Sequence, residues 1–311
     1  MSPASPNLAS VRYARFAFGV LIYNVLVILW GAFVRASGSG AGCGRHWPLC
    51  DGEVLPTAPD LKRIIEFTHR ASSGLDGLLV LALFALAFRV FARGSWVRRF
   101  AVVSLVLTVL EGALGAGLVL LEHVAENKSD ARVLSISLHL ANTLALLAAL
   151  TLTWQHAVVL RVRRDSVSLR RSAFLVAGLL VVVGVLGAIT ALGDTLYPAR
   201  SLAEGMHADV SPLAALPQRL RALHPALAVI TAGVVVWFSG MAAEVLGGAD
   251  RKWATSLKHV VYTQIAFGVI NLLLLVPIWA QLVHLALADT LWIVFVVVCG
   301  RLFWTTTAPE A

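Results

Sequence analysis

Three residues that can carry charge stand together where a long apolar run begins. Glu66, His69 and Arg70 lie within five residues, and their spacings of three and four place them on one face of a helix. A carboxylate can move a proton, an imidazole can bind a metal and a guanidinium can pair with an anion. Charged groups at membrane depth are costly. The cluster is therefore either a functional site or a helix-end ion pair of Glu66 with Arg70, beside which His69 lies at the interface.

Three more histidines, His139, His224 and His284, lie in apolar runs at places comparable to that of His69. Two imidazoles that face each other across a helix bundle are the usual means of holding a haem iron from both sides. Copper or zinc also accepts two histidines, but would need further ligands that are absent at this depth. For any single histidine, a hydrogen bond to the backbone is the alternative. Four at equivalent points of a repeat favour iron ligands.

Three acids, Asp76, Glu111 and Asp289, also fall inside apolar runs. Each can accept a hydrogen bond from a ligand imidazole and so orient it. Each can equally pair with Ser, Thr or Asn on a neighbouring helix, and we favour this structural interpretation for Asp76 and Asp289.

The composition indicates the fold that must position these residues. The chain is 59% hydrophobic, with a mean hydropathy of +0.82, above the usual share for a soluble domain. Continuous apolar runs indicate helices rather than an outer-membrane barrel. We predict an all-α integral membrane protein in which each span needs about 20 residues. The eight predicted spans are Phe16–Val34, Phe67–Val90, Val97–Leu121, Val133–Gln155, Ser172–Leu192, Leu220–Val245, Ala254–Leu275 and Pro277–Phe303.

The second half of the chain repeats the first. The residues around His139 resemble those around His284, and Glu111-Gly-Ala-Leu-Gly115 aligns with Gln264-Ile-Ala-Phe-Gly268. We predict two pseudo-symmetric four-helix bundles, residues 1–165 and 166–311, in which alternate helices lie diagonally. His224 precedes Pro225, which predicts a helix start or a kink there.

The distribution of Lys and Arg predicts the orientation. Most of the 25 basic residues fall in short loops on the side of the termini, which predicts cytoplasmic termini and an outer location for the loop that follows Val34. The net charge of +8 is then a topology signal, and we expect no nucleic-acid partner.

The loop after the first span carries Cys43 and Cys50 in a glycine-rich segment. On the oxidising side of a membrane, we expect the two to form a disulfide. A metal site that includes His46 is the alternative, although it is one ligand short of a closed zinc site. Cys299 lies in the last span, where we expect a small buried apolar residue.

The combination of these motifs resembles a known family, the haem A synthases. The resemblance rests on Arg35-Ala-Ser-Gly-Ser-Gly-Ala-Gly-Cys43, on Trp47-Pro-Leu-Cys50-Asp-Gly, on Glu66-Phe-Thr-His69-Arg70 and on the four histidines, and it covers nearly the full chain. Some members carry a second cysteine pair in the third outer loop, which residues 193–219 here lack.

The resemblance implies a haem-dependent oxidoreductase of the cell inner (plasma) membrane. It implies that His224 and His284 hold haem B, and that substrate haem O binds between His69 and His139. A methyl group of haem O would be oxidised to formyl by successive hydroxylations. Glu66 and the two loop cysteines are implicated in that family. Haem O synthase would hand over the substrate, and a quinol or another donor would supply electrons.

Three alternatives use the same residues differently. A bis-histidine cytochrome that carries electrons from quinol would explain the histidines, but not the Glu66 motif or the paired cysteines. A transporter would fit a parallel repeat, although clearly broken helices are missing apart from Pro225 and Pro277. Haem O synthase is disfavoured, because the sequence has no Asp-rich motif for a diphosphate. Near the outer surface, Arg70, Arg219 and Arg221 can pair with haem propionates.

Overall fold

The computed structural model describes residues 8–57, 60–158, 161–163 and 169–306. It confirms the all-α class. In a bilayer, backbone groups must be satisfied within the segment that carries them, so continuous apolar runs fold as helices. The long helices are α1 (Leu8–Ala36), α2 (Leu61–Val90), α3 (Trp96–Leu120), α4 (Asp130–Val158), α5 (Arg170–Leu196), α8 (Leu223–Val245), α9 (Arg251–Leu273) and α10 (Ile278–Phe303). Shorter elements are α6 (Leu202–Asp209), α7 (Leu216–Arg221) and the 3-10 turn η1 (Gly248–Asp250).

Seven helical segments of the described chain are long and apolar enough to cross a membrane. They are α1 to α5, α10 and the segment Leu216–Val245, which comprises α7 and α8. The protein is therefore a multi-pass membrane protein. The eighth predicted span corresponds to α9, whose 23 residues would reach about 35 Å. Its Lys258, His259 and Gln264 make it more polar than the others, and its crossing stays a prediction.

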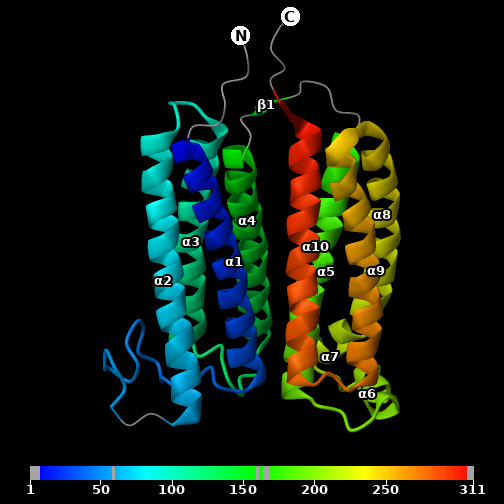
Figure 1. The fold of residues 1–311 in the computed structure, drawn as a ribbon. Helices are drawn as coiled ribbons and strands as arrows, with labels where there is room; N and C mark the ends of the chain where they lie inside the picture. Colours follow the sequence, from blue (N-terminus) through cyan, green and yellow to red (C-terminus); the bar gives the residue numbers. More distant parts are fainter. Residues whose placement is uncertain (1–7, 58–59, 159–160, 164–168, 307–311) are drawn as a thin grey trace, which may run out of the picture.

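The long helices form two groups (Figure 1). In the first group, α1, α2, α3 and α4 contact one another in that order around a ring, so that α2 lies diagonally to α4. In the second group the ring is α5, α8, α9 and α10, so that α8 lies diagonally to α10. Diagonal helices face each other across the interior of a bundle. The helices that carry the four histidines, α2 with α4 and α8 with α10, are the diagonal ones of each group.

The two groups meet along α1 and α4 on one side and α5 and α10 on the other. Trp292 Nε1 on α10 donates a hydrogen bond to the carbonyl of Leu144 on α4 (2.7 Å). Gln155 Nε2 donates to the carbonyl of Val297 (3.0 Å). Buried apolar residues of both groups form one continuous core. The groups are therefore packed together by apolar contact and tied by hydrogen bonds that have no competing water.

Local residue types decide where two of the site helices begin. Asp60 caps α2, and its side chain accepts a hydrogen bond from the backbone N–H of Arg63 (2.8 Å). The helix is interrupted at Ala222, between α7 and α8. His224 and Pro225 therefore lie in the first turn of α8. Proline is tolerated there because early helical N–H groups have no partner within the helix. The predicted interruption near His224 is confirmed.

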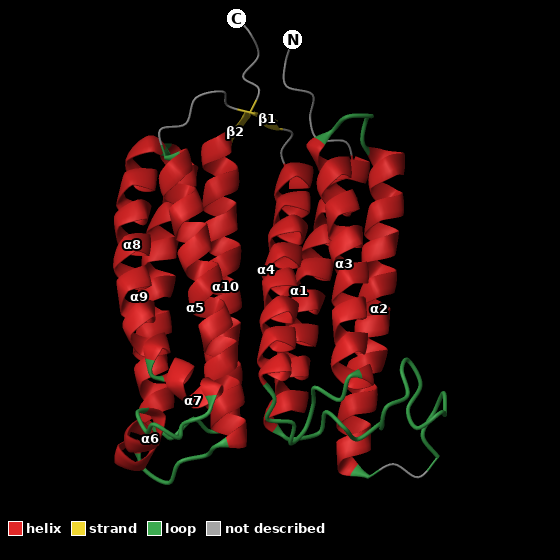
Figure 2. Ribbon diagram, turned by 180° about the vertical axis from the view of Figure 1, so that it is seen from behind, coloured by secondary structure: helices red, strands yellow, loops and turns green. Residues whose placement is uncertain are grey.

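The start of α1 and the end of α10 lie at one end of the molecule, and the cysteine loop, residues 37–57, lies at the other (Figures 1 and 2). At the first end, the strand β1 (Arg161–Arg163) pairs antiparallel with β2 (Trp304–Thr306). The sequence did not predict this two-stranded pairing. The predicted boundary between residues 165 and 166 lies outside the described residues.

Candidate metal centres and the cysteine loop

The structure brings the four histidines together as two pairs. In the first bundle, His69 on α2 and His139 on α4 are close enough for their charged forms to interact electrostatically. The same is true of His224 on α8 and His284 on α10 in the second. All four side chains are only partly buried. Each bundle therefore offers two imidazoles from diagonal helices to one interior.

Each imidazole lies against a glycine of the helix that precedes it in the ring. The pairs are Gly31 with His69, Gly115 with His139, Gly187 with His224 and Gly268 with His284. A Cβ atom at Gly31, Gly187 or Gly268 would come within 2.9 to 3.1 Å of the imidazole Cε1, so close that the ring would have to shift, whereas at Gly115 the distance would be 3.9 Å, an ordinary contact. The glycines permit a close approach that limits how each ring can lie. In the sequence, Gly115 and Gly268 only help to align the two halves, and no pattern there predicts this packing.

The ring nitrogens carry unused hydrogen-bonding capacity. Within the described residues, the Nδ1 atoms of all four histidines are buried and make no hydrogen bond. Two have a polar group nearby: Nδ1 of His139 is 3.5 Å from Glu111 Oε1, and His224 lies near the backbone of Val183. An enclosed Nδ1 leaves Nε2 as the nitrogen available to a ligand.

The number of ligands identifies the kind of metal group that fits. Among the described residues, no cluster of three or more His, Cys, Asp or Glu side chains can hold a metal ion. Zinc and copper sites draw three or four ligands from the protein. A haem carries its iron within its own macrocycle and would need only two imidazoles from the protein, which His69 with His139 and His224 with His284 would supply. The residues present therefore fit a haem in each bundle and do not fit a bare metal ion.

Glu66 is buried, with 3% of its surface exposed. Its Oε1 accepts a hydrogen bond from Arg70 (2.6 Å) and its Oε2 accepts one from the backbone N–H of Cys43 (2.8 Å). The ion pair that the spacing suggested is thus present, but the carboxylate is also bound to the cysteine loop. A helix-end ion pair alone would leave Glu66 in solvent or at the interface. Glu66 is instead buried where the cysteine loop packs on α2.

The cysteine loop is closed by a disulfide between Cys43 and Cys50, as predicted. Both half-cystines are buried, and His46 is exposed, so the alternative of a metal site is wrong. Arg70 donates hydrogen bonds to the carbonyls of His46 and Leu49, each at 2.5 Å. One guanidinium therefore joins the loop to the carboxylate of Glu66.

A second arginine of α2 holds the same loop. Arg63 pairs with Asp51 (2.5 Å) and donates to the carbonyl of Gly42 (3.3 Å). A Cβ atom at Gly42 would lie 2.6 Å from the backbone carbonyl of Lys62, so only glycine fits there. The loop is consequently packed against the first turns of α2, directly beside Glu66.

The three membrane-depth acids differ in their surroundings. Asp76 accepts a hydrogen bond from Asn24 Nδ2 (2.6 Å), the structural role that we favoured. Glu111 accepts hydrogen bonds from Asn142 and Thr143 and lies beside His139. Asp289 is buried, and its Oδ2 has no hydrogen-bond partner within the described residues. Glu111 alone of the three adjoins a histidine pair.

The arginines suggested for propionate binding are already engaged. Arg221 pairs with Asp194 (2.9 Å) and Asp209 (2.5 Å). Arg219 donates to the backbone carbonyls of Pro212 and Ala214. The charge of Arg221 is thus balanced by protein carboxylates, so a propionate would have to compete with two of them. Binding of propionates by these residues stays a prediction.

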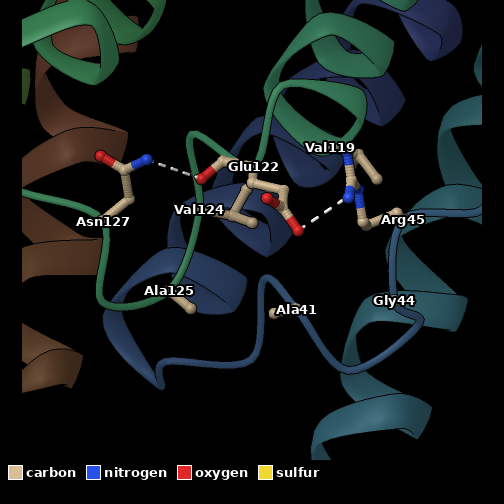
Figure 3. Close-up of a pocket in the computed structure, with 8 residues that line it drawn as sticks. All are labelled: Ala41, Gly44, Arg45, Val119, Glu122, Val124, Ala125 and Asn127. Atoms are coloured by element: carbon tan, nitrogen blue, oxygen red, sulfur yellow. Dashed lines mark hydrogen bonds and ion pairs between the residues drawn. The ribbon is translucent and has the colours of Figure 1, made fainter. Parts of the chain in front are cut away.

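A cavity of about 380 Å³ opens between the cysteine loop and the α3–α4 loop. Figure 3 shows Arg45 and Glu122 forming an ion pair across it (3.2 Å), and Asn127 donating to the carbonyl of Glu122. Its remaining lining residues are Ala41, Gly44, Val119, Val124 and Ala125. The sequence did not predict this cavity, which is lined mainly by small apolar side chains.

The fold and the paired imidazoles define a multi-pass α-helical membrane protein with two candidate haem centres. The chain belongs to the COX15-CtaA family, described as cytochrome oxidase assembly protein, whose profile matches residues 14–296. The resemblance to haem A synthase is thereby confirmed at the level of the family.

Individual relatives carry two different names. The chain is 44% identical over 304 residues to a "Protoheme IX farnesyltransferase" of Thermus thermophilus, a match that covers 96% of this chain and 49% of that protein. It is 42% identical over 103 residues to the "Heme A synthase" of Alkalihalophilus pseudofirmus, covering 33% of each. A match of 42% over 104 residues to the "Heme A synthase" of Halalkalibacterium halodurans covers 33% of this chain and 35% of that protein. The chain thus spans about half the length of the Thermus relative.

Proposed function

We propose that this protein is a haem A synthase, which oxidises a methyl group of haem O to formyl by successive hydroxylations. Family membership and the names of the shorter relatives support this assignment. The name of the Thermus protein belongs to a chain about twice as long. We attribute that name to the half that this chain does not match, because the present sequence lacks an Asp-rich motif for the prenyl diphosphate.

The two bundles have different functions. His224 and His284 hold haem B in the C-terminal half, residues 166–311, and His69 and His139 receive haem O in the N-terminal half, residues 1–165. Eight crossings, with α9 as the seventh, give both halves the same orientation. The termini are then cytoplasmic, and the cysteine loop lies on the outer face of the inner membrane.

One observation supports this division: within the described residues, Glu111 lies beside a histidine of the N-terminal pair and Glu66 lies one turn before the other, and the equivalent positions of the second half carry no carboxylate. Glu66 precedes His69 by three residues, and the equivalent position before His224 is Arg221. Glu111 lies beside His139, and Gln264 takes its place beside His284. A permanently held haem needs two ligands only, whereas oxidation of a substrate requires groups that hold or move protons. The asymmetry therefore favours chemistry in the N-terminal half.

The residues around Glu66 suit proton handling next to a bound haem. The haem, when bound, supplies the redox metal that oxidation of an unactivated methyl group needs. Glu66 can hold a proton or stabilise positive charge on the substrate. Arg70 and the N–H of Cys43 fix both oxygens of its carboxylate, and the disulfide loop is tied to this end of α2 by Arg70.

The partners follow from the reaction. Haem O comes from a protohaem farnesyltransferase, and fusion of both activities in one chain would explain the length and name of the Thermus relative. Each hydroxylation requires an oxygen atom and a two-electron oxidant; with molecular oxygen in both roles, a quinol or another membrane donor supplies the two electrons that reduce its second oxygen atom to water.

Analysis of the haems in the purified protein tests the proposal. The full chain is co-expressed with a haem O source, purified from membranes, and its extracted pigments are identified by chromatography and mass spectrometry. We expect haem B together with haem O and haem A. A bis-histidine electron carrier would contain haem B in both bundles and form no haem A, and that result would reject the synthase.

A further inference from the structure

We propose that Glu111 is a positioning residue for His139. It holds the imidazole in the orientation and the tautomer in which Nε2 can bind the iron of the substrate haem. This inference rests on the proposed function, because it assumes that haem O binds between His69 and His139.

The carboxylate of Glu111 is itself firmly placed. Its Oε2 accepts a hydrogen bond from Asn142 Nδ2 (2.5 Å), and its Oε1 accepts one from the hydroxyl of Thr143. Both donors lie on α4, three and four residues after His139. Asn142 also donates to the carbonyl of Leu107 on α3 (3.0 Å). A carboxylate from α3 is thus fixed to the turn of α4 that carries the histidine.

The same carboxylate points at the unused nitrogen of the ring. Glu111 Oε1 lies 3.5 Å from Nδ1 of His139, and this Nδ1 makes no hydrogen bond within the described chain. A small rotation of the ring closes the distance to a hydrogen bond. An acceptor at Nδ1 keeps the proton there, so that Nε2 carries the lone pair that a metal requires.

His139 needs such a partner more than the other three histidines. A Cβ atom at Gly115 would be 3.9 Å from its Cε1, whereas the corresponding distances at the other three glycines are 2.9 to 3.1 Å. The neighbouring helix therefore confines this ring less closely. Glu111 precedes Gly115 by one turn of α3 and supplies the missing restraint.

In the described part of the C-terminal bundle, no carboxylate takes the place that Glu111 has beside His139. Gln264 stands where the first half has Glu111, and its Nε2 lies 3.4 Å from Nε2 of His284, the opposite ring nitrogen. The repeat aligns Asn142 and Thr143 with Leu287 and Ala288, which cannot donate side-chain hydrogen bonds. Among the described residues, this contact of a carboxylate with a histidine therefore belongs to the N-terminal bundle, in which we propose that haem O binds.

Titration of the purified full chain with haem O tests this role. The dissociation constant is read from the absorption spectrum, and the midpoint potential of the added haem is measured separately. We expect Glu111→Gln to weaken haem O binding by about 10–100-fold. The potential should become more positive, because the ligand imidazole loses an anionic partner, and the haem B content should not change. Asp76→Asn removes another buried carboxyl of the same bundle, two turns from His69, and should leave haem O affinity unaltered.

Two further variants separate positioning from stability. In a His139→Ala background, Glu111→Gln should have no additional effect on haem O affinity, since it acts through His139. Glu111→Asp keeps the charge and should recover part of the affinity. A Glu111→Gln protein that is less stable but binds haem O with unchanged affinity and potential would overturn the proposal, as would an Asp variant no better than Gln. If the unmodified protein fails to bind haem O at all, the proposed function falls, and this inference falls with it.

Discussion

The backbone N–H of Cys43 donates a hydrogen bond to Oε2 of Glu66 across 2.8 Å. A half-cystine of the loop and an acid of α2, 23 residues apart in the chain, are therefore one structural unit. Any change that frees the loop also frees one oxygen of a buried carboxylate. Haem A formation should consequently depend on the disulfide, even though neither sulfur is assigned to the chemistry.

Replacing Cys50 by Ser tests this dependence. Loss of the bridge should lower the free energy of unfolding by about 2–3 kcal/mol, because the closed loop is short. The variant should retain haem B and form haem A at least about 10-fold more slowly, since Glu66 loses a fixed partner. Pigment analysis measures the product, and alkylation before and after reduction confirms the state of the thiols. Unchanged haem A formation would show that the loop does not position Glu66.

Glu66→Gln tests the acid itself. The substitution preserves size but removes the charge that Arg70 pairs with. We expect a folded protein that retains haem B and accumulates haem O or a partly oxidised product, with the rate lowered about 10²–10⁴-fold as for loss of a general acid or base. Glu122→Gln, which changes an exposed acid of the neighbouring loop, serves as the control and should leave the rate unaltered. A normal rate in Glu66→Gln would reduce Glu66 to a partner of Arg70.

The histidine pairs should respond differently to substitution. His224→Ala or His284→Ala should lose haem B and lower the unfolding temperature, because a ligand that binds only the folded state stabilises it. His69→Ala or His139→Ala should keep haem B and abolish haem A formation. Haem content by absorption spectroscopy and thermal unfolding measure both effects. Equal loss of haem B from both pairs would contradict the division of labour and favour an electron carrier.

The glycines beside the imidazoles provide a matched comparison. Gly268→Ala and Gly187→Ala place a methyl group 3.0 to 3.1 Å from the ring carbon, so the imidazole must move. We expect haem B affinity to fall by about 10-fold or more, as when the surroundings of a metal ligand are disturbed. In Gly115→Ala the corresponding distance is 3.9 Å, an ordinary contact, and haem O affinity should be nearly unchanged. If Gly268→Ala binds haem B normally, the glycine contact does not position the ring.

The sequence alone predicted the all-α membrane class, the seven helical segments able to cross a membrane, and the histidines that we propose bind haem. Apolar runs about 20 residues long fold as helices because the bilayer provides no other partner for the backbone. The histidines in the repeat, and the cysteines seven apart, followed from residue type and spacing. These inferences concern neighbours along the chain or a pattern that repeats. They need no knowledge of how one helix is rotated against the next.

Tertiary structure alone decided which side chains meet. The contacts of Cys43 with Glu66 and of Gly31 with His69 join different elements. The same is true of Glu111 with the turn of α4 after His139, and of the pairing of Arg221 with Asp194 and Asp209. Such contacts depend on how far each helix is rotated and how deep it lies in the membrane. The packing of apolar surfaces against one another sets this rotation and depth. A spacing of three or four residues along the sequence does not specify them. The sequence therefore identified the histidines, and only the packing of the helices showed that the carboxylate of Glu111 lies beside His139.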